Sequence, residues 1–197
     1  ELNIPGEKEN LGKGVAYCPH CDGPFFKNKE VAVVGGGNSG VEAALDLSGI
    51  AKKVSLIEFM PDLKADQILV DKVKNSDNIE IFTNTKSKEV VSESGIVNGL
   101  LCEKRENSEE FLIPLKGIFV QIGLIPNSNF VKNLVKTTSH GEIIIDESGK
   151  TSIEGIFACG DVTTIPYKQI VISMGEGAKT ALTVADYLMK DYSEVAA

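Results

Sequence analysis

The sequence predicts an α/β protein built on a parallel sheet, and three observations support this class. Residues 31–83 alternate short apolar runs with amphipathic segments, in the order strand, helix, strand, helix, strand. Strands that alternate with helices pair in parallel through right-handed crossovers. Residues 86–115 then form three short strand-like runs separated by turn residues, which is typical of an antiparallel meander. A glycine-rich turn, GGGNSG, stands between the first strand and the first helix.

The elements of the first part follow in order along the chain. Residues 1–17 are polar and rich in glycine, so we expect turns there. EVAVVGG predicts a strand buried on both faces, NSGVEAALDLSG a helix that ends at Gly49, and KKVSLIEF a second buried strand. We expect the next helix to span residues 61–76, with Pro61 in its first turn, and a third strand at NIEIFTN.

The second part begins after the buried strand predicted at GIFVQIG, where LIPNSN interrupts the pattern. We predict a short helix near 129–136, strands at EIIIDE and GIFACGD, and a long helix from about Gln169 to Lys190. The sequence therefore indicates a boundary at LIPNSN.

Composition and charge exclude several classes of function. The chain has 197 residues, of which 42% are hydrophobic, and a net charge of −8. Lys and Arg form no cluster, which argues against a nucleic-acid partner. The longest apolar runs are shorter than the roughly 18 residues of a membrane span. We expect a cytoplasmic protein without a signal peptide, and we interpret Glu1 as the start of a fragment or processed product.

The glycine-rich turn fits the spacing G-x-G-x-x-G through Gly35, Gly37 and Gly40. In a dinucleotide-binding turn these glycines serve a tight turn, close approach to a pyrophosphate, and close packing of helix and strand. Glu58 ends the second strand, 18 residues after Gly40, where a carboxylate accepts the ribose hydroxyls of NAD and repels the 2′-phosphate of NADP. The alternative is a structural turn with an ordinary charge at a strand end. We predict a Rossmann-like NAD site that also includes Gly36, Asn38 and Ser39.

Two cysteines, Cys18 and Cys21, are separated by two residues. A zinc site needs four ligands, but Cys102 and Cys159 stand alone in strand-like segments and the chain has only two histidines. Two unrelated buried thiols are another alternative. We favour a redox dithiol, because this spacing lets both sulfurs meet in a small ring. No metal site is predicted, and Cys102 and Cys159 are expected in the core.

The neighbours of the dithiol suggest how it reacts. Asp22 follows Cys21 directly and could handle the proton during thiol exchange, although Asp-Gly is also a common turn. His20 could assist the thiolate or be a polar loop residue, and the sequence favours neither. A dithiol does not take a hydride from a nicotinamide productively by itself. The usual intermediary is a flavin, so we expect a flavin beside NAD.

Four longer motifs occur in a fixed order along the chain: YCPHCDGPFFKNKEVAVVGGGNSGVEAALDL, GIFVQIGLIPN, GIFACGDVTT and YKQIVISMGEGAKTAL. With these motifs the chain resembles the thioredoxin-reductase-like flavoproteins, in particular the flavoprotein subunits of alkyl hydroperoxide reductase, along essentially its whole length. The resemblance implies that residues 1–123 are an NAD-binding domain that carries the dithiol. It also implies that residues 124–197 are the C-terminal part of an FAD-binding domain.

The resemblance further assigns residues in the second domain. Asp161, next to Gly160, would contact the ribityl-phosphate region of the flavin. Gln169 and Ile170, at the start of the last helix, would lie near the isoalloxazine. From the residues alone, a capped amphipathic helix without a ligand is the simpler interpretation.

The resemblance also implies a path for electrons. NADH would reduce FAD, and the reduced flavin would reduce the Cys18–Cys21 disulfide, with Cys21 facing the flavin and Cys18 attacking the acceptor disulfide. That acceptor would be an N-terminal disulfide domain that serves a peroxiredoxin, and the full-length protein would be a homodimer. Neither that domain nor the family's first G-x-G-x-x-G precedes Tyr17 here. We therefore expect this chain to bind FAD weakly or not at all. A thioredoxin reductase and a non-catalytic NAD-binding module are the alternatives.

Overall fold

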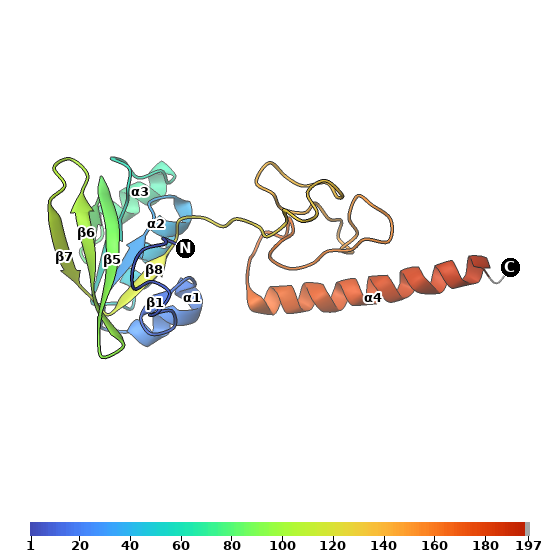
Figure 1. The fold of residues 1–197 in the computed structure, drawn as a ribbon, viewed down its shortest axis with the longest axis horizontal. Coiled ribbons are helices and arrows are strands. Elements are labelled where there is room, and N and C mark those ends of the chain that lie inside the picture. Colours follow the sequence, from blue (N-terminus) through green and yellow to red (C-terminus); the bar gives the residue numbers. More distant parts are fainter. Residues whose placement is uncertain (196–197) are drawn as a thin grey trace. The chain divides into compact units, whose positions relative to one another are not determined.

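The computed structural model describes residues 1–195, and the chain divides into two compact units, Glu1–Gly123 and Leu124–Ala197 (Figure 1). The first unit is an α/β domain with a parallel sheet and a separate antiparallel sheet, so the predicted fold class is confirmed.

The parallel sheet of the first unit has five strands in the order β1-β8-β2-β3-β4. All four neighbouring pairs run parallel. The central strands are apolar because helices cover one face of the sheet and the meander covers the other. The bounds are β1 (Val15–Ala16), β2 (Glu30–Val34), β3 (Lys53–Ile57), β4 (Ile79–Phe82) and β8 (Gly117–Val120).

Helices α2 (Asn38–Ser48) and α3 (Gln67–Lys74) lie on one face of the sheet, as Figure 1 shows. The second face carries the predicted meander of β5 (Thr85–Glu93), β6 (Ile96–Lys104) and β7 (Glu110–Pro114). Each interface has its own core of fully buried side chains. On the helix side these include Val33, Leu47, Leu56 and Phe119, and on the meander side Ile57, Leu100 and Ile118.

Two short helices, α1 (Pro19–Asp22) and η1 (Gly23–Phe26), connect β1 to β2. Strand β1 was not predicted, because two buried residues within a polar, glycine-rich segment carry no periodicity. β1 pairs with β8 and is therefore an edge strand of the five-stranded sheet.

The helix predicted from Pro61 begins only at Gln67. The Lys64 N–H donates to the carbonyl oxygen of Gly36 at 2.8 Å, and the Asp66 N–H donates to Oδ1 of Asn38 at 2.8 Å. These bonds hold residues 61–66 in an open segment along the glycine-rich turn, because a backbone N–H bonded there is not available to a helix.

The second unit consists of the long helix α4 (Ile170–Val195) and a set of turns. The predicted start of α4 near Gln169 is confirmed, whereas the helix near 129–136 is wrong, since these residues form turns. The strands predicted at EIIIDE and GIFACGD are also wrong. Within the described residues they contribute only isolated bridges, namely Thr137 to Ile143, Ile143 to Thr163, and Lys150 to Phe157.

Among residues 1–195, no helix combines the length and the hydropathy that a membrane crossing requires.

Candidate dinucleotide and disulfide site

The glycine-rich turn joins β2 to α2, and two of its glycines are required by the packing. Gly35 has a φ of +122°, and a Cβ there would lie 2.2 Å from the carbonyl oxygen of Gln121. A Cβ on Gly40 would lie 1.8 Å from the carbonyl oxygen of Gly35. A Cβ on Gly37, in contrast, would meet nothing within 4 Å. The first and third glycines therefore serve the fold, and the second leaves open space where a ligand could approach the backbone.

Glu58 follows β3 and points back to the turn. Its Oε2 accepts a hydrogen bond from the Gly36 N–H at 2.5 Å, and its Oε1 accepts one from the Met60 N–H at 2.7 Å. The residue is only 9% exposed, and a Cβ on Gly36 would lie 2.6 Å from Oε2. Each carboxylate oxygen keeps a second lone pair, so Glu58 can still accept ribose hydroxyls.

A cavity of about 590 Å³ opens beside the turn. Most of the predicted nucleotide-site residues line this cavity, namely Gly35, Gly36, Gly37, Asn38, Ser39 and Glu58. Gly40 does not line it and packs against the Gly35 carbonyl. The side chain of Asn38 is held by Asp66, to which its Nδ2 donates at 3.1 Å. The sequence did not predict the other lining residues, which include Leu2, Ile4, Phe59, Thr85, Lys86, Ser87 and Gln121.

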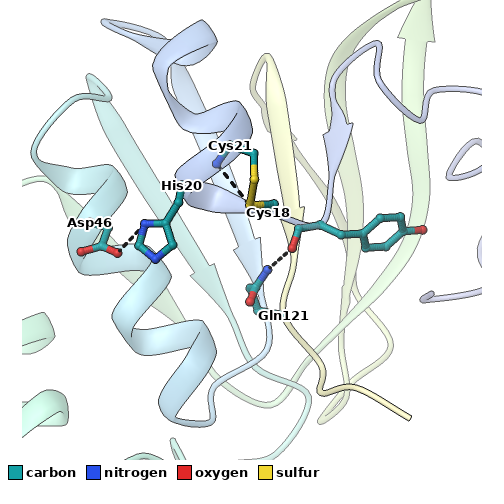
Figure 2. Close-up of a disulfide and its surroundings, with 6 residues drawn as sticks. Cys18, His20, Cys21, Asp46 and Gln121 are labelled. Atoms are coloured by element: carbon teal, nitrogen blue, oxygen red, sulfur yellow. Dashed lines mark hydrogen bonds and ion pairs between the residues drawn. A yellow bond between two sulfur atoms is a disulfide. The ribbon is translucent and has the colours of Figure 1, made fainter. Parts of the chain in front are cut away.

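Cys18 and Cys21 form a disulfide with a Cα–Cα distance of 5.3 Å (Figure 2), so the predicted pairing is confirmed. Residues 17–23, called here the redox loop, carry this disulfide directly after β1. Within the part of the chain that the structure describes, no group of three or more His, Cys, Asp or Glu side chains could hold a metal ion.

The two sulfurs differ in their surroundings. Cys18 is the N-cap of α1, and its Sγ accepts a hydrogen bond from the Cys21 N–H at 3.2 Å. A donor aimed at sulfur stabilises a thiolate when the disulfide is reduced. Cys21 is exposed and Cys18 is half-buried. The half-buried Asp22 does not cap η1 with its side chain.

His20 lies beside the disulfide but points to α2. Its Nδ1 is 3.6 Å from Oδ2 of Asp46, and both side chains are largely exposed (Figure 2). Of the two interpretations left open by the sequence, this contact favours that of a polar loop residue, which ties the redox loop to the helix that begins at the glycine-rich turn.

Gln121, which directly follows β8, contacts both the cavity and the redox loop. Gln121 lines the cavity, and its Nε2 donates to the carbonyl oxygen of Tyr17 at 2.9 Å (Figure 2). β8 lies between β1 and β2, and all three strands are parallel. Since the redox loop follows β1 and the glycine-rich turn follows β2, both lie at the carboxyl edge of one sheet, where ligands of such sheets bind.

The other two cysteines lie elsewhere. Cys102 in β6 is fully buried between the parallel sheet and the meander, as expected of a core residue. Burial raises the pKa of its thiol to about 12. Cys159, in the second unit, is only half-buried, so its prediction as a core residue holds in part.

In the second unit, the residues assigned by resemblance gather at the start of α4. Oδ1 of the exposed Asp161 accepts a hydrogen bond from the Ser173 hydroxyl at 2.6 Å. Gly160 has a φ of +79°, and a Cβ there would lie 3.3 Å from Ser173 Oγ. The Gln169 carbonyl accepts from the Ser173 N–H, and Ile170 is 79% exposed. The N-terminus of α4 can face an anion here, and the Asp161 carboxylate can accept hydrogen bonds from hydroxyl groups.

A disulfide and a glycine-rich turn at one edge of a parallel sheet indicate the class of nucleotide-dependent disulfide oxidoreductases. The family model described as pyridine nucleotide-disulphide oxidoreductase matches residues 1–184. The chain therefore belongs to this family.

Several curated proteins, each named as the F subunit of alkyl hydroperoxide reductase, are similar to this chain, which confirms the resemblance inferred from the motifs. The protein from Pseudomonas putida is 54% identical over 190 residues, which cover 96% of this chain and 36% of the relative. The one from Escherichia coli (strain K12) is 52% identical over 189 residues, with shares of 96% and 36%. The chain thus spans about a third of the length of these relatives.

Solved structures of thioredoxin reductases have the same fold. The enzyme from Streptococcus pyogenes has a TM-score of 0.91 and 36% identity, and the match covers 96% of this chain and 62% of that one. The thioredoxin reductase from T. acidophilum has a TM-score of 0.71 and 39% identity, with the same shares of 96% and 62%.

Proposed function

We propose that this chain is the NADH-binding and dithiol-bearing part of a flavoprotein disulfide reductase that supplies electrons to a peroxiredoxin system. The observation that carries the proposal is the shared edge of the sheet, where Gln121 lines the cavity and also holds the redox loop. The similarity to the F subunits of alkyl hydroperoxide reductase supports the choice of acceptor.

The nucleotide site is proposed at the glycine-rich turn. Backbone N–H groups at Gly37 and at the N-terminus of α2 would receive the pyrophosphate, since Gly37 faces open space. Glu58 would accept the ribose hydroxyls, because its carboxylate is held in place by Gly36 and Met60. A 2′-phosphate beside this carboxylate would be repelled, so NADH is preferred over NADPH.

The dithiol is proposed to transfer two electrons by thiol–disulfide exchange. The Cys18 thiolate attacks one sulfur of the acceptor disulfide and releases the other sulfur as a thiolate, which takes up a proton. Cys21 then loses its proton and attacks the Cys18 sulfur, which restores the Cys18–Cys21 disulfide and releases the second acceptor sulfur as a thiolate that takes up a proton. Asp22, next to Cys21, is proposed to accept the proton in this second step.

The flavin is proposed to be held in part by Gly160, Asp161, Gln169 and Ile170. When bound, FAD supplies the two-electron chemistry between a nicotinamide and a disulfide. The hydrogen bond that Asp161 accepts from Ser173 in the first turn of α4 supports this role, because it limits the motion of the carboxylate. The sequence carries the G-x-G-x-x-G spacing only at residues 35–40, so a second loop for the flavin pyrophosphate does not come from residues 1–195.

The nucleotide assignment is tested by calorimetric titration of NADH and NADPH. Glu58→Arg should weaken NADH binding and strengthen NADPH binding, since it replaces the repelling charge with an attracting one. Glu93→Arg is the matched control, because Glu93 is an exposed acid at the end of β5 and should leave both affinities unchanged. Equal affinities for NADH and NADPH in the unmodified chain would contradict the assignment.

The acceptor is tested by mixing the reduced chain with two oxidised proteins in parallel. One is the N-terminal disulfide domain of the flavoprotein component of an alkyl hydroperoxide reductase, and the other is a thioredoxin. We expect faster oxidation of the dithiol by the first, and no transfer from a Cys18→Ser chain. Preference for thioredoxin would favour the thioredoxin reductase alternative, and transfer to neither would favour a non-catalytic module.

A further inference from the structure

The first ten residues, called here the N-terminal strap, form a wall of the candidate nucleotide cavity. The side chains of Leu2 and Ile4 line the cavity and pack against the core between the sheet and the meander. The strap is fixed to β5, since the Val90 N–H donates to the Pro5 carbonyl at 2.9 Å. A Cβ on Gly6 would lie 2.2 Å from the Val90 carbonyl oxygen, which shows how closely the two segments approach.

The Glu7 carboxylate fixes the strap through hydrogen bonds. Its side chain has no exposed surface, although a carboxylate is costly to bury without partners. Its oxygens accept hydrogen bonds from the backbone N–H groups of Leu2 at 2.8 Å and Asn3 at 2.7 Å. The hydroxyl of Tyr17 donates to Oε1 at 3.2 Å. One buried carboxylate therefore joins the cavity wall to the redox loop.

Tyr17 connects Glu7 to the disulfide, because it immediately precedes Cys18 in the chain. Its side chain is bound by Glu7, and its carbonyl oxygen is bound by Gln121. Burial, followed by the charge of Glu7 and the hydrogen bond to it, raises the pKa of Tyr17 to about 12. The backbone that leads into Cys18 is thus held by two residues. Gln121 lines the cavity itself, and Glu7 is bonded to Leu2, which lines it.

We propose that Glu7 is a positioning residue that holds the cavity wall and the redox loop in one arrangement, so that a dinucleotide in the cavity changes the reduction equilibrium of the Cys18–Cys21 disulfide. The coupling rests on the proposed function, which identifies the ligand as a dinucleotide. By thermodynamic linkage, the oxidation state of the disulfide also changes the affinity for that ligand.

Three variants separate positioning from general stability. Tyr17→Phe removes only the hydroxyl and leaves the bonds of Glu7 to Leu2 and Asn3 in place. Glu7→Gln keeps the size of the side chain but removes its charge. Glu9→Gln is the matched control, because Glu9 is an exposed acid on the same strap. Circular dichroism checks that each variant is folded, and Tyr17→Phe decides the outcome if Glu7→Gln is not.

The first measurement is the thiol–disulfide equilibrium of the chain with mixtures of reduced and oxidised dithiothreitol, without nucleotide. Loss of the Glu7 contact should favour the dithiol by about 2- to 10-fold, the range expected for one hydrogen bond, because a looser loop no longer holds the two thiols at disulfide distance. Glu9→Gln should match the unmodified chain. An unchanged equilibrium in Tyr17→Phe overturns the positioning role.

The second measurement repeats the equilibrium with saturating NAD⁺, which binds but delivers no electrons. In the unmodified chain NAD⁺ should shift the equilibrium by about 5-fold or more, the lower end of typical couplings. In Tyr17→Phe this shift should fall by more than half, and an equal shift in both chains overturns the coupling. Failure of the unmodified chain to bind NAD⁺ refutes the proposed function and the coupling, while the nucleotide-free measurement still decides whether Glu7 positions the redox loop.

Discussion

The contact between Gly40 and Gly35 gives a prediction whose size follows from the structure. In Gly40→Ala the new Cβ would lie 1.8 Å from the Gly35 carbonyl oxygen, whereas real Cβ atoms essentially never approach closer than 3.0 Å. The start of α2 must therefore retreat by about 1.2 Å from the turn. Gly35 cannot yield easily, because its N–H donates to the carbonyl oxygen of Ile57 at 2.8 Å.

Two terms set the change in the free energy of unfolding. Overpacking of this kind costs up to about 3 kcal/mol. Replacing glycine by alanine within a helix returns about 1 kcal/mol. We expect Gly40→Ala to destabilise the first unit by about 2 kcal/mol. Gly37→Ala should cost less than about 1 kcal/mol, since Gly37 is the N-cap of α2 and its Cβ meets nothing within 4 Å.

The assay combines urea unfolding, followed by circular dichroism, with amide hydrogen exchange of β2 and β3, which assigns the loss to the first unit. NADH titration then separates the two variants, because the Gly37→Ala methyl group occupies the proposed pyrophosphate site and should weaken binding in a stable protein. A Gly40→Ala chain as stable as the unmodified one would refute the close packing of turn and helix. Unchanged NADH binding by Gly37→Ala would refute the site.

Three further predictions concern other parts of the chain. Thiol counting in denaturant should find two more thiols per chain after strong reduction, and an unchanged count would exclude the Cys18–Cys21 disulfide. Ultraviolet titration should show one tyrosine of pKa about 12 that is absent in Tyr17→Phe. Because this pKa exceeds the ordinary tyrosine value of 10.0, Tyr17 contributes stability that is full below pH 10 and is lost as the pH rises through 12, so Tyr17→Phe should be less sensitive to alkali. After incubation with FAD and desalting, the chain should retain little flavin, because Asp161 and its neighbours supply only part of a flavin site. A visible absorption band of one flavin per chain would contradict this expectation.

The sequence predicted most of the first unit because its apolar runs are bounded by clear turn residues. The buried strands, α2 and the three-stranded meander follow directly from apolar periodicity and turn residues. The glycine spacing and Glu58 could also be found, because each serves a requirement that few residues meet. The strap was missed, since nothing in the polar run GEKEN indicates that Glu7 is buried by contacts with a residue ten positions later.

The second unit was predicted less well for a physical reason. The segments EIIIDE and GIFACGD have the composition of strands, but a strand is stabilised by cross-strand pairs, and within residues 1–195 they find only single bridges. The segment at 129–136 has helical spacing, but eight residues are too few for a helix without strong packing. Local pattern alone could not indicate that these partners would be lacking.

The burial of Cys102 has a consequence for the fidelity of the proposed thiol–disulfide exchange. With a pKa of about 12, only about one in 10⁵ of its thiols is ionised at neutral pH. Thiolates, rather than thiols, attack disulfides, and Cys102 is also closed off from solvent. The first unit thus holds three cysteines but only one competent exchange pair. Scrambling to a Cys102-containing disulfide is suppressed by ionisation and by access together, so in the proposed exchange the two electrons would stay on Cys18 and Cys21.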